Sequence, residues 1–124
     1  MTPQEIFDKV VTHLRKQGCK ALAKTRAGKT VCHYRGDNNT ACAVGCLIED
    51  SEYRPWMEGL AAIAVLKHPE VPASLKMRLK DHTPLLARLQ NVHDTVELEL
   101  WEKEFQMTTE RFKLKYSRAV TPIV

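Results

Sequence analysis

The first residues of chemical interest are basic and lie near the start of the chain. Of the 19 basic and 15 acidic residues, eight bases and no acid fall between Lys9 and Gly36. The remaining 11 bases and 15 acids give the rest of the chain a net charge of −4, against +4 overall. A basic block on a slightly acidic body indicates an anion site or a nucleic-acid face. A solvated surface that maintains solubility explains the block equally well. The eight residues are Lys9, Arg15, Lys16, Lys20, Lys24, Arg26, Lys29 and Arg35.

Any phosphate would have to be bound by side chains, because no glycine-rich phosphate loop is present. The sequence contains neither a Walker motif nor Gly-x-Gly-x-x-Gly. Arginine suits the task, since its planar guanidinium donates to two phosphate oxygens at once. Beyond the basic block, the chain has five arginines: Arg54, Arg78, Arg88, Arg111 and Arg118.

A polar run, Gln90 to Thr95, separates two apolar segments. Asn91 carries a donor and an acceptor on one tip, Asp94 accepts from ribose hydroxyls, and His93 donates or stacks. Such a run suits the binding of a base or a ribose. The simpler interpretation is that Asn91 ends one helix while Asp94 and Thr95 cap the next. The two interpretations are compatible.

The four cysteines are predicted to be reduced thiols that do not hold a metal. Cys32, His33, Cys42 and Cys46 lie within fifteen residues, which raises the question of zinc. Adjacent residues on a strand point to opposite faces, so Cys32 and His33 are poorly placed to share one ion. No Gly-x-Ser-x-Gly elbow is present, and the histidines are scattered. A Cys–His pair stays open, but the sequence predicts no cofactor, no catalytic residue and no enzyme.

The N-terminal segment carries every signal of a helix over residues 3–17. Thr2 and Glu5 form a capping box, Pro3 occupies the first helical position, and Gly18 ends the segment. Its apolar residues recur at helical spacing. They are Ile6, Phe7, Val10, Val11 and Leu14.

The rest of the chain predicts one hairpin and several helices. Residues 19–30 indicate a loop with at most a helical turn at 20–24, and 30–35 with 40–48 predict a hairpin around the turn 36–39. Helical patterns follow near Pro55, over 60–67 and 71–81, and from Thr83. On the last of these, the residues expected to face the core are Leu85, Leu86, Leu89 and Val92. A last long helix, capped by Asp94 or Thr95 and restarting at Thr108, points Leu98, Trp101 and Phe105 inward.

These elements indicate a single α+β domain that is mostly helical, with several helices packed around one small antiparallel hairpin. We expect a globular domain over 1–116 and a C-terminal tail over 117–124. The composition is that of a folded protein, with 44% hydrophobic and 27% charged residues. No apolar stretch is long enough to span a bilayer, and residues 1–5 do not resemble a secretory signal. We therefore expect a cytoplasmic protein.

Three stretches together resemble a group of small phage-encoded proteins, and within it the first Thoeris anti-defence family, whose members act as sponges for an immune signal. The resemblance covers most of residues 2–116, in this order and spacing, and is most specific in its central part. The stretches are Thr2–Val10, Cys32–Gly36 followed by Cys42–Ile48, and Leu89–Asp94.

The resemblance implies that the protein binds the cyclic ADP-ribose isomer made by bacterial TIR-domain immune proteins and sequesters it without cleavage. On this basis we expect the ligand to contact Arg54, Asn91 and Arg111, with His93 and Asp94 from the polar run. A second candidate anion site comprises Lys24, Arg26 and Arg35.

The resemblance also implies a homo-oligomer, a dimer or larger, in the cytoplasm of a bacterial host. Some members of the family bind cyclic oligonucleotides at separate sites. No membrane partner is expected, and nucleic acid is a disfavoured one. Two alternatives remain open, namely a basic protein that inhibits a host enzyme by covering it and a weak nucleic-acid-binding protein.

Overall fold

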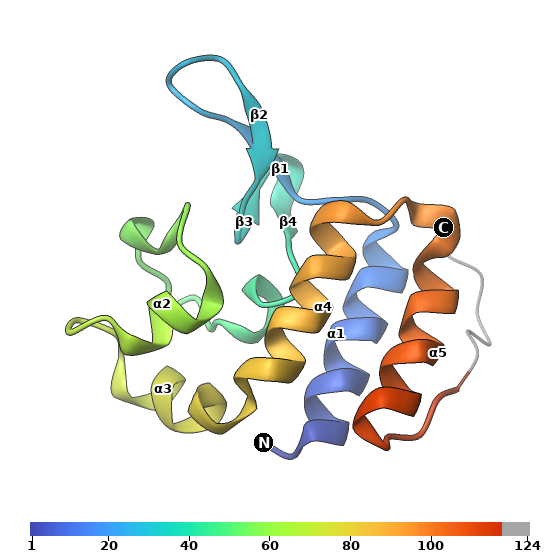
Figure 1. Cartoon of the computed structure of the whole chain (residues 1–124). Coiled ribbons are helices and arrows are strands. Elements are labelled where there is room, and N and C mark those ends of the chain that lie inside the picture. Colours follow the sequence, from blue (N-terminus) through green and yellow to red (C-terminus); the bar gives the residue numbers. More distant parts are fainter. Residues whose placement is uncertain (118–124) are drawn as a thin grey trace.

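Three helices lie side by side and form the main helical part of the fold (Figure 1). The computed structural model describes residues 1–117. The core lies between the three helices and the segments packed on them, and Phe7 meets Phe105 edge-on there. Ion pairs Arg15–Glu102 and Arg88–Glu104 join the helices at the surface. The helices are α1 (Pro3–Gln17), α4 (Thr83–Thr95) and α5 (Trp101–Phe112).

Helix α1 has the bounds and the buried face that the sequence predicts. Thr2 Oγ1 accepts from the amide of Glu5 at 3.1 Å, and Glu5 Oε1 accepts from the amide of Thr2 at 2.7 Å. Gly18 ends the helix in the left-handed region at φ 68°. The five apolar residues expected on its inner face are all buried. Local signals fix this helix because both caps and one uninterrupted stripe agree.

The mostly helical α+β fold is confirmed, but it has two short antiparallel pairs of strands where the sequence predicts one small hairpin. The first pair projects from the body as a narrow arm (Figure 1), and residues 25–29 connect its strands. The expected loop or helical turn over 20–24 is wrong, since Leu22 pairs with Cys32 and Lys24 with Thr30. The turn at 36–39 is confirmed, but its strands are only two residues long. The strands are β1 (Leu22–Lys24), β2 (Thr30–Cys32), β3 (Arg35–Gly36) and β4 (Thr40–Ala41).

Short helical segments connect the strands to α4. The apolar run expected over 60–67 forms α2 (Ala62–Lys67), and the next forms α3 (Ala73–Leu79). Pro55 begins a single 3-10 turn, η3 (Pro55–Met57). The other 3-10 turns are η1 (Asp37–Asn39), η2 (Gly45–Leu47), η4 (Lys80–His82) and η5 (Leu98–Leu100).

Helix α4 is longer than expected, and this changes the role of the polar run. The helix continues through Thr95, so neither Asp94 nor Thr95 caps the next helix, and Asn91 does not end this one. Helix α5 begins only at Trp101 and runs unbroken past Thr108. Trp101 is buried as expected, whereas Leu98 is 44% exposed. The polar run therefore belongs to the last two turns of α4.

Of the predicted tail, only Ser117 lies within the described residues. Its carbonyl accepts a hydrogen bond from Arg15 at 2.7 Å. Residues 118–124, including Arg118, lie outside the described part of the chain. Over residues 1–117, no helix combines the length and the apolar character needed to cross a membrane.

Candidate functional site

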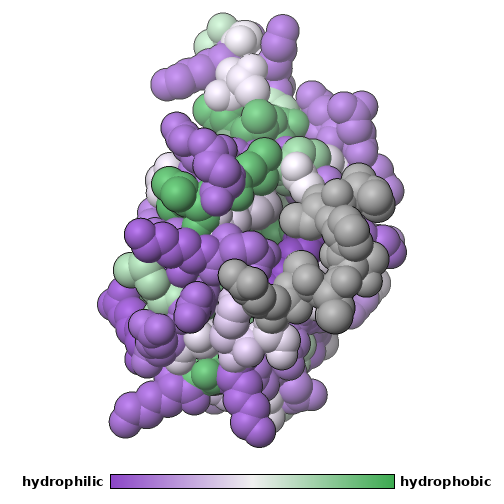
Figure 2. Space-filling model, turned by 90° about the vertical axis from the view of Figure 1, so that its right-hand side faces the viewer, coloured by the Kyte–Doolittle hydropathy of each residue, from purple (hydrophilic) through white to green (hydrophobic). Residues whose placement is uncertain are grey.

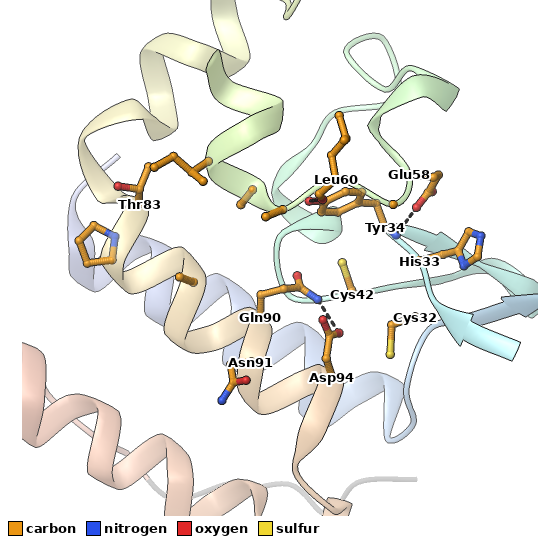
Figure 3. Close-up of a pocket in the computed structure, with 16 residues that line it drawn as sticks. Cys32, His33, Tyr34, Cys42, Glu58, Leu60, Thr83, Gln90, Asn91 and Asp94 are labelled. Atoms are coloured by element: carbon orange, nitrogen blue, oxygen red, sulfur yellow. Dashed lines mark hydrogen bonds between the residues drawn. The ribbon is translucent and has the colours of Figure 1, made fainter. Parts of the chain in front are cut away.

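A cleft of about 640 Å³ opens between α4, the segment 58–63, the residues 32–34 at and after the end of β2, and Cys42 (Figure 3). We call it the α4 cleft. Its volume lies in the range of small-ligand pockets, about 300–1,000 Å³. Its apolar lining is Leu60, Ala61, Ala62, Ile63, Pro84 and Ala87, with the backbone of Gly59. Its polar lining is Cys32, His33, Tyr34, Cys42, Glu58, Thr83, Gln90, Asn91 and Asp94.

The segment 58–63 is held in place by Glu58 and Tyr34. Glu58 Oε1 accepts from the amide of Tyr34 at 2.8 Å. Glu58 Oε2 accepts from the amide of Arg35 at 3.1 Å and from the hydroxyl of Tyr53 at 2.8 Å. The Tyr34 hydroxyl donates to the carbonyl of Leu60. Burial raises the pKa of Tyr34, so the phenol keeps its proton and this bond. Glu58 therefore has a structural task, since its oxygens bind three donors of the protein.

Asp94 is the carboxylate that this fold presents to the cleft. Gln90 Nε2 and His93 Nδ1 both donate to its Oδ1, each at 2.7 Å (Figure 3 shows the first). Burial opposes the charge of Asp94, but the hydrogen bonds from His93 and Gln90 outweigh it and lower the pKa of this carboxyl. The side chain is 35% exposed. Asp94 is thus an ionised acceptor held in one orientation from its own helix.

His93 is buried behind Asp94 and fixed in one tautomer. Its Nε2 lies 3.0 Å from the amide of Ala21, which can only donate, so Nε2 is the acceptor and Nδ1 carries the proton to Asp94. His93 and Ala21 are both fully buried. The ring therefore joins α4 to the chain just before β1. His93 positions Asp94 and has no free nitrogen for a ligand.

Cys32, His93 and Asp94 bring possible metal ligands within 4.8 Å of one another, but their bonding does not suit a metal. Both nitrogens of His93 are already engaged. Burial, and then the charge of Asp94, raises the pKa of the Cys32 thiol to about 11. Burial raises that of Cys42 to about 12. Because metal ligation and nucleophilic attack both use the thiolate, the protonated thiols are poorly suited to either.

We expect the replacement of His93 by phenylalanine to destabilise the protein by about 2 kcal/mol. The change keeps an aromatic ring beside Trp101 but leaves the buried amide of Ala21 without an acceptor, which costs about 1–3 kcal/mol. Urea unfolding would measure the loss. Asn91→Ala is the matched control, because Asn91 is exposed on the same helix and alanine favours helix. Equal stability of the two variants would contradict the role given to His93.

The structure brings together some of the ligand residues expected from the sequence and separates others. Asn91 and Asp94 line the α4 cleft, and His93 lies behind them. Arg54 is exposed and donates to the carbonyls of Ser51 and Tyr53. Arg111 lies near the end of α5, over the ring of Phe112. Neither arginine is among the described residues that line the cleft.

The second candidate anion site is also divided. Arg35 donates to Asp50 at 2.6 Å and to the carbonyl of Ile48 at 2.8 Å, and it lies over the ring of Tyr53. Lys24 and Arg26 are exposed on the projecting arm. Neither of them forms an ion pair with another described residue. The arm thus keeps free positive charge, whereas that of Arg35 is used in the fold.

Sequence reasoning did not find Tyr34, Glu58 or Gln90 as site residues. Tyr34 carries a weak signal as the one aromatic residue of the basic block. Glu58 precedes Gly59 in a turn and carries none, because the backbone amides that it accepts from lie 23 and 24 residues away. Gln90 is part of the polar run, and only the extension of α4 to Thr95 shows that it orients Asp94 at i+4.

Comparison of the chain with protein-family models, curated proteins and solved structures found no match. The site is therefore interpreted from its own geometry.

Proposed function

We propose that this protein binds and sequesters a nucleotide-type signal molecule without cleaving it. The observation that carries the proposal is the α4 cleft itself. It combines an apolar lining with a carboxylate that His93 and Gln90 hold charged and oriented. Apolar walls with a few fixed polar groups are typical of small-ligand sites. The sequence resemblance supplies the specific ligand, a cyclic ADP-ribose isomer.

Binding without cleavage is supported by the protonation states of the side chains that line the cleft. The pKa values of Cys32 and Cys42 are raised to about 11 and 12, so both thiols are protonated at neutral pH. A thiol attacks as its thiolate, and raised pKa values make these poor nucleophiles. Tyr34 keeps its proton as well. The carboxylate of Asp94 is bound by two donors that orient it.

The charge of the cleft constrains how such a ligand would lie. Glu58 and Asp94 line it, and none of the described lysines and arginines does. A pyrophosphate inside would face two carboxylates, whereas a base and ribose would not be repelled. Phosphates would lie at the rim. Lys20 is a cation close to the cleft, since its Nζ lies 3.4 Å from the backbone carbonyl oxygen of Asp94.

A homo-oligomer is part of the same proposal. Figure 2 shows that the α5 side is mostly hydrophilic, with hydrophobic patches in the upper part of this view. Leu98, Leu100 and Met107, on η5 and α5, are each at least 44% exposed. Exposed apolar side chains on adjoining elements favour contact with a second copy. Sedimentation of a single 14.2 kDa species would contradict assembly.

Calorimetric titration with cyclic ADP-ribose and its isomers tests the proposal, followed by chromatography of the ligand released on heating. We expect one of them to bind and to be recovered intact. Asp94→Asn should weaken binding by about tenfold or more, because a hydrogen bond to a charged group contributes about 1.5–3 kcal/mol. Recovery of a cleaved product, or no binding at millimolar ligand, would contradict sequestration.

Arg54→Ala and Arg111→Ala distinguish the cleft from the rest of the surface. The sequence resemblance predicts that both arginines contact the ligand, whereas neither lines the cleft within one chain. If Asp94→Asn alone weakens binding, the α4 cleft of a single chain is the site. If the arginine variants weaken binding while Asp94→Asn does not, the ligand is bound outside the cleft.

A further inference from the structure

The acceptors of the α4 cleft are unequally occupied. Both oxygens of Glu58 already bind donors from Tyr34, Arg35 and Tyr53. The side-chain oxygen of Gln90 accepts from the amide of Val44 at 3.0 Å. Of the charged acceptors that line the cleft, this leaves Asp94 to bind a ligand.

Within Asp94, the two oxygens differ. The nitrogen donors of Gln90 and His93 both reach Oδ1. No nitrogen of a described residue donates to Oδ2. The thiol of Cys32 is the nearby sulfur donor, with Sγ within 4.8 Å of one oxygen of the carboxylate. A thiol is a weak donor, so Oδ2 keeps most of its capacity to accept. Figure 3 shows the carboxylate directed into the space between Gln90 and Cys32.

The rest of the lining restricts what can meet this oxygen. An anion inside the cleft is disfavoured, because two carboxylates line it and none of the described lysines and arginines does. Leu60, Ile63 and Pro84 offer apolar surface suited to a flat ring. A planar heterocycle with an N–H donor at its edge satisfies both conditions.

We infer that Asp94 Oδ2 accepts a hydrogen bond from an exocyclic amine of the ligand. The α4 cleft would therefore select amino-bearing nucleobases over their oxo counterparts. The inference rests on the proposed function and specifies which end of the ligand enters the cleft. The selection arises because a partly buried carboxylate that faces a carbonyl oxygen loses a hydrogen bond and meets a like partial charge. An amine in the same position donates to it.

Adenosine and inosine test the inference, since adenosine carries a 6-amino group beside an unprotonated N1, whereas inosine carries a 6-oxo group beside a protonated N1. Ligand-observed NMR suits their expected millimolar affinities. Adenosine should bind about tenfold more tightly than inosine, as expected for one hydrogen bond to a charged group. Equal binding, tighter binding of inosine, or no binding of either nucleoside would overturn the inference.

Asp94→Asn gives a sharper outcome, because the surrounding donors fix how the new amide turns. Gln90 Nε2 and His93 Nδ1 would keep the amide oxygen at the position of Oδ1, which places the amide nitrogen where Oδ2 was. The cleft would then present a donor, and inosine should bind more tightly than adenosine. A retained preference for adenosine would overturn the assignment to Asp94. Asp81→Asn makes the same change at an exposed carboxylate outside the cleft and should keep the wild-type preference.

The cyclic ADP-ribose titration separates this inference from the proposed function. If that ligand binds while the two nucleosides bind equally, only the amine selection fails. If neither the nucleosides nor cyclic ADP-ribose binds at millimolar concentration, both fail. Thermal unfolding of Asp94→Asn establishes that the variant is folded, and the wild-type comparison stands without it.

Discussion

Gly45→Ala should unfold most of the protein or lower its free energy of unfolding by at least about 4 kcal/mol. A Cβ at Gly45 would lie 2.2 Å from the carbonyl oxygen of Tyr34 and 2.9 Å from its carbonyl carbon. Both are backbone atoms, so no side-chain rotation relieves the overlap. Losses of this size are exceptional among single substitutions and follow from gross overpacking. Urea unfolding followed by circular dichroism would measure it.

Gly28→Ala is the control for this substitution. Gly28 lies in the turn of the projecting arm at φ 79°, and nothing lies within 4 Å of the added methyl group. Alanine at this position should lower the free energy of unfolding only by the cost of its left-handed backbone conformation, about 1–2 kcal/mol. A loss at Gly45 no larger than that at Gly28 would contradict the close approach of η2 to Tyr34. That approach matters for the site, because Tyr34 forms part of the cleft wall.

The helices could be predicted where local signals agree. In α1 the capping box, the proline, the terminal glycine and the apolar stripe all indicate the same bounds. On α4 the residues expected inside, Leu85, Leu86, Leu89 and Val92, are all buried. Spacing of 3.6 residues suffices in these cases, because each helix buries one face against its neighbours.

Strand pairing could not be predicted, because it depends on partners distant in sequence. The run 30–35 has strand character, but residues 40–48 and 22–24 compete for it. The structure gives Thr30–Cys32 to β1 and leaves Arg35 and Gly36 to a separate pair. Close packing explains part of this division, since Gly36 has no room for a side chain against Ala21 and Leu22. Such contacts are not encoded in the alternation of any single strand.

Only part of the candidate site can be predicted from the sequence, because the roles of its residues depend on where α4 ends. The sequence offers Asp94 both as a ligand residue and as a helix cap, and it predicts a ligand contact for His93, which the structure instead places behind Asp94. The helix boundary decides between these roles, and boundaries are the least certain part of sequence interpretation. Once α4 continues to Thr95, Gln90 lies one turn before Asp94, and His93 faces the core. For Arg54 and Arg111, which the resemblance implies as ligand contacts, the neighbouring sequence does not indicate where they lie relative to the cleft.

Glu52 forms a polar link outside the cleft, between the segment 47–52 and α3. It is only 4% exposed. Arg78 donates to both of its oxygens, at 2.7 and 2.8 Å, and Ser74 donates as well. Arg78 also donates to the carbonyl of Leu47 at 2.7 Å. The hydrogen bonds from Arg78 lower the pKa of Glu52 to about 2, against burial, which would raise it.

Glu52→Ala should therefore destabilise the protein by about 3–5 kcal/mol, since it leaves Arg78 without its partner in a partly buried position. Asp50→Ala is the matched control, because Asp50 pairs with Arg35 in the same segment but is 95% exposed. Exposed pairs contribute about 0–1 kcal/mol. Urea unfolding at neutral pH compares the two. Losses of equal size would contradict the role of Glu52.

The same ion pair predicts an acid-dependent loss of stability. Because the pKa of Glu52 is about 2 when folded and near 4.5 when unfolded, the unfolded chain binds the proton more readily. The stabilisation is complete above about pH 4.5 and is lost as the pH falls towards 2. We expect this part to amount to about 2 kcal/mol in the wild type and to be absent in Glu52→Gln, which cannot titrate. Urea unfolding at several pH values between these limits would measure the difference. If the free energy of unfolding of the two proteins changed with pH in parallel, Arg78 would not be lowering the pKa of Glu52, and the prediction would be wrong.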